Sequence, residues 1–209
     1  MSDTNKLTYG LSNVHVWPIT ATNEQGVPTY GTKIAVPGAK EVSLSAEGET
    51  IKFYADNIIY WAAEANNGYS GTLTIVRVPE AFAEQILKQI KDVNGALVED
   101  ANATGAEFAM AFEFEGDVNK KRHIFYRCTA GRPEVSSKTK EENIEPNTQE
   151  LSINCIPRLD NHFVKATIED ATSSAYSGWY GTAPYEPTLT ATPVVAPEET
   201  EPEGEGNNG

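Results

Sequence analysis

The segment Glu107–Cys128 reads "EFAMAFEFEGDVNKKRHIFYRC" and alternates large apolar side chains with small or charged ones. The large side chains are Phe108, Met110, Phe112 and Phe114, and the residues between them are Ala109, Ala111 and Glu113. A period of two is typical of a β-strand with one buried face. Five residues, "GDVNK", then lead towards a second strand-like run, "HIFYRC". The segment therefore predicts a half-buried strand in a β-hairpin.

Similar short runs occur on both sides of this hairpin, separated by Gly, Pro, Asn and Asp. They include "GTLTIVRV" (71–78), "ELSINCI" (150–156) and two alternating sets, Val42, Leu44, Ala46 and Ile51, Phe53, Ala55. One helical pattern interrupts them, "PEAFAEQILKQIKDVNG" (79–95), with an apolar stripe of Phe82, Ile86, Ile90 and Val93. Gly95 is placed to end this helix, and Glu84 with Lys88 forms an i, i+4 pair. The chain is therefore predicted to be mainly β, with one amphipathic helix against a sheet.

Charge is distributed unevenly along the 209 residues, which carry 30 acids and 16 bases. Six of the acids lie in the Pro- and Glu-rich segment 186–209, so residues 1–185 hold 24 acids against 16 bases. We predict a folded domain at 1–185 and a disordered tail or linker at 186–209. The negative body argues against sequence-specific nucleic-acid binding and against anionic membranes. The N-terminus lacks a secretory pattern, so we expect cytoplasmic synthesis.

No catalytic or metal-binding pattern stands out. His15, His123 and His162 lack ligand spacing, and nucleophile-elbow, Walker and dinucleotide motifs are missing from the sequence. Cys128 and Cys155 are expected to be small buried hydrophobes, and a disulfide between them depends on whether their strands are neighbours. The basic run Lys120–Arg122 is expected at a solvated hairpin turn. The sequence predicts a protein that is not an enzyme and has no cofactor.

The segment "FYADNIIYWAAEANNGYSGTLTI" (53–75) places large apolar side chains on a connection between two strand-like runs. Either these side chains are buried under their own fold, or they are reserved for another copy of the protein. A third interpretation is a carbohydrate-binding β-sandwich that stacks sugars on aromatic side chains. Its platform would combine Tyr60, Trp61, Tyr69, Trp179 and Tyr180.

Several motifs in order resemble the major tail proteins of long, non-contractile-tailed bacteriophages of the phi13 type. They are "YGLSNVHVWPIT", "FYADN", "NNGYSGTLTI", "RVPEAFAEQIL", "VNGALVED", "FAMAFEFEGD", "RHIFYRCTAGRP" and "SSKTKEENIEPNTQELSI". The resemblance runs from about Tyr9 to about Trp179 and leaves out the acidic tail. It implies an antiparallel β-sandwich or flattened barrel with one flanking α-helix, the phage tail-tube fold.

The resemblance also implies a structural virion protein whose hexameric rings stack into a tube for DNA ejection. Its partners would be further copies of itself, tape-measure and tail-terminator proteins, and DNA in non-specific passage, with no membrane. It would act in the virion tail after assembly in the host cytoplasm. The connection 53–69 would then reach neighbouring subunits, with Tyr54, Ile58, Ile59, Tyr60 and Trp61 as contact residues.

Two further assignments follow from the same resemblance. The lumen-lining candidates are Glu107, Glu113 and Glu115, which share the polar side of the 107–115 strand. The polar stretch 132–149 is expected to be a long loop that either contacts the next ring or remains solvated. Whether the segment from Glu186 continues by recoding into an extra domain is left open by these residues.

Overall fold

A computed structural model of the chain describes residues 5–137, 139 and 147–189. It confirms the predicted fold class, with 47% strand, 6% helix and a large antiparallel sheet. Within the described residues, nine strands share this sheet, in the order β2-β1-β10-β11-β12-β7-β4, with β13 beside β11 and β3 beside β1. Two separate hairpins, β5–β6 and β8–β9, stand outside it.

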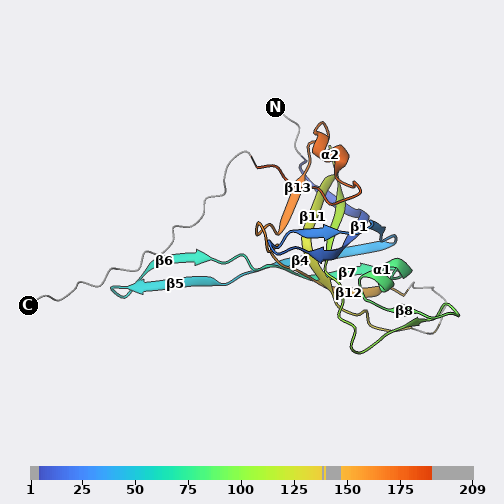
Figure 1. Cartoon of the computed structure of the whole chain (residues 1–209). Coiled ribbons are helices and arrows are strands. Elements are labelled where there is room, and N and C mark those ends of the chain that lie inside the picture. The colour runs from blue at the N-terminus through green and yellow to red at the C-terminus, as the bar shows by residue number, and fades with distance from the viewer. Residues whose placement is uncertain (1–4, 138, 140–146, 190–209) are drawn as a thin grey trace, which may run out of the picture.

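The elements have the following bounds. The strands are β1 (Thr8–Thr22), β2 (Pro28–Tyr30), β3 (Ile34–Ala35), β4 (Ala39–Glu47), β5 (Thr50–Ala55), β6 (Ile58–Glu64), β7 (Gly68–Ile75), β8 (Ile90–Lys91), β9 (Leu97–Val98), β10 (Phe108–Gly116), β11 (Lys121–Ala130), β12 (Gln149–Cys155) and β13 (Lys165–Ile168). The helices are α1 (Glu80–Gln85) and α2 (Ser174–Gly178). Figure 1 shows β5–β6 extending from one side of the body and β8 lying on the other.

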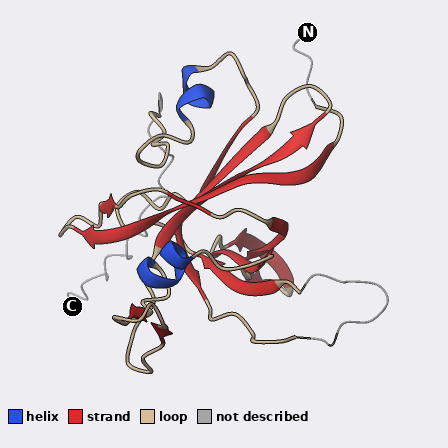
Figure 2. Cartoon of the chain, turned by 90° about the vertical axis from the view of Figure 1, so that its right-hand side faces the viewer, coloured by secondary structure: helices blue, strands red, loops and turns tan. Residues whose placement is uncertain are grey.

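The large sheet curls on itself, so that its edge strand β4 returns next to β1. Strong twist of this kind is the ordinary consequence of strand chirality, and Figure 2 shows the strands fanning out with the two short helices apart from each other. The enclosed core combines side chains from both halves of the sheet with two from the α1 segment. Its largest fully buried members are Leu73, Ile75, Phe82, Ile86, Phe108, Met110, Leu151 and Ile153.

The predicted hairpin 107–128 is confirmed, with Phe112 of β10 opposite His123 of β11. The prediction that its first strand is half-buried is wrong, because β10 is buried on both faces. Ala109 and Ala111 belong to a second apolar cluster with Trp17, Ile124, Tyr126 and Trp179. Trp179 follows α2 and covers these small residues from outside the sheet, with its Nε1 donating to the carbonyl of His123 (3.4 Å).

The predicted helix 79–95 is wrong in length, because α1 ends at Gln85. Lys88 adopts a left-handed backbone conformation (φ 59°), which no helix interior tolerates. Phe82 and Ile86 are buried as the apolar stripe predicts, but Ile90 is 59% exposed and Val93 is fully exposed. The Glu84–Lys88 pair is replaced by an ion pair between Lys91 and Glu80.

A turn at Asp92–Gly95 competes with the expected helix. The Asp92 carboxylate accepts hydrogen bonds from the backbone N–H groups of Asn94 (2.9 Å) and Ala96 (2.7 Å). Gly95 has φ 86°, which only glycine adopts readily. These contacts fold the chain back, so that β8 pairs with β9 instead of continuing α1.

The folded body extends slightly beyond the predicted boundary at 185. Arg158 is buried, and its guanidinium donates to Asp160 (Oδ2, 2.6 Å) and to Glu186 (Oε2, 2.7 Å). Tyr185 stacks on Trp179 with ring centroids 4.9 Å apart. The rest of the predicted tail, from residue 190, lies outside the described residues.

His123 provides a pH-dependent contribution to stability. Burial lowers its pKa to about 4, assisted by Lys121 and Lys165 and opposed by Glu169. The unfolded chain therefore binds a proton near pH 6.5 while the folded chain does not, and acidification favours unfolding. We expect the free energy of unfolding to fall by up to about 1.4 kcal/mol per pH unit between pH 6.5 and 4.

The variant His123→Phe isolates this effect. The His123 ring stacks on Phe112 with centroids 5.3 Å apart, so a phenyl ring preserves the contact and removes the titration. Urea denaturation at several pH values should show that the free energy of unfolding of the variant depends less on pH between pH 6.5 and 4, because the His123 titration is gone. Carboxylates elsewhere titrate in both proteins, so some pH dependence remains in the variant. An equal dependence of the free energy of unfolding on pH in both proteins would contradict the assignment of this effect to His123.

Candidate assembly surface

The strand predicted from the alternation of Ile51, Phe53 and Ala55 is confirmed as β5, and it pairs with β6 in a hairpin over 50–64. Most of the connection 53–69 is therefore a β-hairpin and not a loop. β5 and β6 pair in antiparallel register, with Phe53 opposite Trp61, and the turn between them is Asp56–Asn57. Both turn residues have positive φ, 52° and 62°, as a type I′ turn requires. We call this hairpin the arm.

The arm continues the β4–β7 pair of the sheet. Backbone N–H groups of Ala65 and Asn67 donate to the carbonyls of Glu49 (3.0 Å) and Glu47 (2.9 Å), which bridges the break between the two ladders. The strands approach so closely here that a Cβ on Gly48 would lie 2.0 Å from the Ala65 carbonyl oxygen. A side chain at position 48 would therefore collide with the opposite strand at the base of the arm. Figure 1 shows the arm, β5–β6, extending away from the body.

Strand alternation divides the arm into two faces. The register places one entirely apolar set together, which we call the apolar face: Ile51, Phe53, Ala55, Ile58, Trp61 and Ala63. The opposite set, the mixed face, contains Thr50, Lys52, Tyr54, Ile59, Ala62 and Glu64. Tyr60 is the extra residue where the register shifts between the Phe53 and Tyr54 pairs.

All five predicted contact residues, Tyr54, Ile58, Ile59, Tyr60 and Trp61, are 50–73% exposed. The alternative, burial under the chain's own fold, is therefore wrong. Two residues outside the predicted set complete the apolar face, Ile51 (56% exposed) and Phe53 (59% exposed). Their alternation alone is typical of an ordinary half-buried strand, and the Asp56–Asn57 turn signal indicates a hairpin but not whether a further strand lies beside it.

The arm exposes large apolar side chains on a hairpin that cannot bury them by itself. A two-stranded hairpin on its own is marginally stable in water, because it lacks a third strand or helix to cover a face. The arm also has no packing partner in the apolar clusters of the body. An apolar face of this kind is characteristic of surfaces that a binding partner covers.

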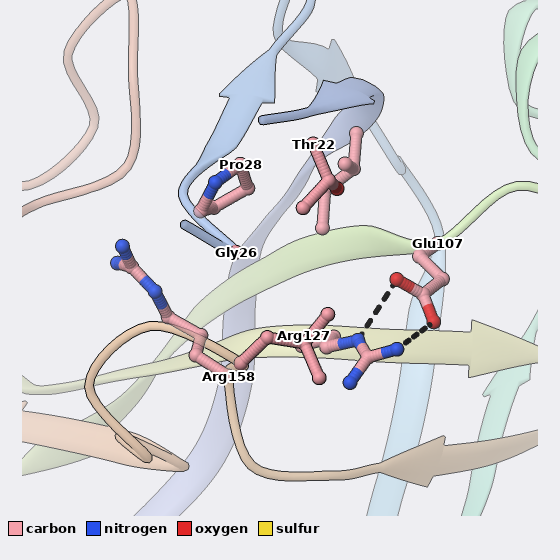
Figure 3. A pocket seen from close by; sticks show the side chains of 8 residues that line it. Thr22, Gly26, Pro28, Glu107, Arg127 and Arg158 are labelled. Atoms are coloured by element: carbon pink, nitrogen blue, oxygen red, sulfur yellow. Dashed lines mark hydrogen bonds and ion pairs between the residues drawn. The ribbon is translucent and has the colours of Figure 1, made fainter. Parts of the chain in front are cut away.

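The lumen candidates form ion pairs within the chain, and they are Glu107, Glu113 and Glu115. Arg127 donates to Glu107 through Nε (2.8 Å) and Nη2 (2.7 Å). Figure 3 shows this pair beside a small pocket, with the Arg158 side chain directed away from Glu107. The assignment of Glu107 to a lumen stays a prediction.

Glu113 is buried (4% exposed) and has no surface to present to a lumen. It accepts hydrogen bonds from Lys120 Nζ (3.1 Å) and Arg122 Nε (3.1 Å). Lys120 also pairs with Glu115 at 2.8 Å, and Arg122 lies 3.6 Å above the Tyr176 ring centroid. The basic run 120–122 therefore neutralises acids of the same subunit.

Glu113→Lys is expected to lower the free energy of unfolding by about 3–5 kcal/mol. The change removes the buried carboxylate that Lys120 and Arg122 share and places a third cation beside them. The matched control is Glu115→Lys, at a partly exposed acid that shares Lys120, with an expected loss under about 1 kcal/mol. Urea denaturation of both variants measures the difference. Equal losses would show that burial of Glu113 is unimportant.

The proposed sugar-stacking platform is not formed. Trp179 is buried in the second cluster, and Tyr69 packs edge-on against Phe125 in the first (5.3 Å between centroids). Tyr60 and Trp61 lie on the arm, apart from both. The structure thus separates the aromatic residues that the carbohydrate-binding interpretation needs together.

Other predicted features give no further site. Among the described residues, no group of His, Cys, Asp and Glu side chains could hold a metal ion. Their helices include none long and apolar enough to cross a membrane. Of the predicted loop 132–149, residues 138 and 140–146 lie outside the described residues, so its expected contact role stays a prediction. Comparison of the chain with protein-family models and with curated proteins finds no match.

Proposed function

We propose that the chain is a structural subunit of a bacteriophage tail tube. Six copies form a ring, and rings stack into the conduit through which DNA leaves the virion. The motif resemblance supports the hexameric ring and the phage tail as its place. The exposed arm supports self-assembly.

The arm is the observation that carries the proposal. It exposes four large side chains on one face, Ile51, Phe53, Ile58 and Trp61. When a hairpin that projects from one side of a subunit docks on a different surface of a second copy, the contact joins unlike surfaces. Contacts of this heterologous type close into rings or propagate as open filaments. A tube of stacked rings uses both outcomes.

The charge pattern is consistent with a conduit. Some acids of the described body are paired with bases of the same chain, such as Glu107 with Arg127 and Glu169 with Lys121 (2.6 Å), and the other described acids keep the body negative. A net negative protein repels DNA phosphates and does not hold them by counterion release. DNA in this proposal passes without specific binding. Tape-measure and tail-terminator proteins would be the partners inside the tube and at its end.

Self-assembly is tested by size-exclusion chromatography with light scattering over a concentration series, with negative-stain microscopy of the same fractions. We expect rings and stacked tubes to replace the 22.7-kDa monomer as concentration rises. A monomer at every concentration would contradict the proposal. A glycan titration that shifts tryptophan fluorescence would favour the carbohydrate-binding alternative instead.

A further inference from the structure

The two cysteines meet in the core on neighbouring strands. Cys128 of β11 lies directly opposite Cys155 of β12, and the Cys128 thiol donates a hydrogen bond to the Cys155 sulfur, 2.8 Å away. Both are free thiols with no exposed surface. The sequence left this pairing open because it depends on which strands are neighbours.

The backbone geometry around the two thiols suits a cross-link. The N–H of Ile156 donates to the carbonyl of Arg127 (2.9 Å), and the N–H of Gly131 donates to that of Ser152 (2.7 Å). Hydrogen-bonded pairs thus alternate along the ladder, and Cys128–Cys155 is a non-hydrogen-bonded pair. In such pairs the Cα atoms lie about 4.5 Å apart, within the range of about 4.4–6.8 Å that disulfides span.

The cysteine pair lies in a short ladder of the sheet. β12 meets β11 over three residue pairs, but meets β7 over seven. Among the described strands, this short ladder is the only one that joins β12-β7-β4, which carries the arm, to β2-β1-β10-β11. A covalent bond at Cys128–Cys155 would therefore link the two halves of the sheet.

We propose that Cys128 and Cys155 form an oxidative modification site, which a small-molecule disulfide such as oxidised glutathione converts to a cross-strand disulfide. One cysteine thiolate attacks the glutathione disulfide and releases one glutathione thiolate. The second cysteine thiolate attacks the resulting mixed disulfide and releases the other. The two protein thiols lose two protons and two electrons, and the glutathione disulfide is reduced to two glutathione molecules.

Burial controls the rate of this reaction. It raises the pKa of the Cys128 thiol well above its usual value, with the Cys155 thiol acting in the same direction. The folded Cys128 thiol is therefore protonated and both sulfurs are shielded, so exchange proceeds when the three-pair ladder opens or before it closes. Once formed, the bond closes a loop between positions 27 apart in sequence and restricts the unfolded chain.

An equilibrium experiment tests the inference without depending on that rate. The purified full chain is brought to equilibrium with glutathione at graded reduced-to-oxidised ratios, from both the reduced and the oxidised protein, with and without denaturing urea. Free thiols are then alkylated, and intact mass with peptide mapping gives the fraction linked. We expect half-oxidation of the native protein at a ratio at least about tenfold more reducing than in urea, because folding holds the sulfurs together.

Several outcomes would overturn the inference. They are equal half-oxidation ratios in the native protein and in urea, a native ratio that is less reducing, or glutathione adducts and linked dimers in place of the internal bond. Cys128→Ser and Cys155→Ser are the controls and should show no internal link. If either variant fails to fold, the half-oxidation ratios of the unaltered protein with and without urea still show whether folding favours the disulfide. A second expected result is a rise of roughly 5–10 °C in the unfolding temperature of the oxidised protein.

Discussion

Replacing both Phe53 and Trp61 by serine should leave the protein monomeric at concentrations at which the unaltered chain forms rings and tubes. The two side chains face each other across the arm and form the centre of its apolar face. Full burial of an aromatic or aliphatic side chain contributes about 1.5–3 kcal/mol. Loss of two of them weakens each contact by roughly 100-fold or more. Light scattering on chromatographic fractions measures the effect.

The matched control is Tyr54→Ser with Ile59→Ser, the cross-strand pair on the mixed face of the same arm. Both double variants remove one exposed cross-strand pair, so they weaken the hairpin itself to a similar degree. We expect the control to assemble, at a higher threshold concentration. Equal loss of assembly in both would mean that hairpin order, and not the apolar face, decides the contact. Neither double variant should change the unfolding temperature of the monomer, because the arm packs against none of the core.

Trp179→Ala should strongly lower the stability of the folded chain. Trp179 is 1% exposed and covers the small residues Ala109 and Ala111 on the outer face of β10. Its removal also frees Tyr185, which stacks on it. Truncating a buried tryptophan to alanine typically costs about 3–5 kcal/mol, because a cavity remains where the ring was. Urea denaturation of the monomer measures the loss.

Trp61→Ala provides the control for that experiment, since it makes the same chemical change at an exposed position. We expect its effect on the free energy of unfolding to stay within about 0.5 kcal/mol. A comparable loss in both variants would contradict the existence of the second cluster. A loss in Trp179→Ala alone would show that the segment after α2 is part of the folded domain.

Local alternation was sufficient to predict β12 and its buried face, because every second side chain of β12 is buried as its sequence pattern indicates. Alternation also predicted β10 as a strand, but not that both of its faces are buried. The second cluster could not be predicted in this way. Ala109 and Ala111 are small enough for either environment, and the side chain that covers them comes from Trp179, about 70 residues further along the chain. Burial that depends on such distant contacts leaves no local signal.

The predictions for 79–95 and 53–69 differ from the structure for another reason, because each segment contains a turn signal that competes with the predicted element. In 79–95, helical periodicity continued through Asp92–Gly95, although Asp and Asn-Gly favour a turn. In 53–69, Asp56–Asn57 marked a hairpin, but the large apolar residues on both sides suggested a loop. The exposure of the five predicted contact residues was nevertheless predictable, because it follows from their unusual position and not from the exact element. Their contact role stays a prediction.

The most direct test of the account follows Trp61 fluorescence during assembly. The chain has three tryptophans, and Trp17 and Trp179 are buried whereas Trp61 is 53% exposed. Iodide quenching of the monomer should therefore report on the arm, and Trp61→Phe should abolish the quenchable fraction. If the arm is a subunit contact, that fraction disappears as light scattering records rings and tubes. Rings that form while Trp61 stays open to iodide would contradict the account.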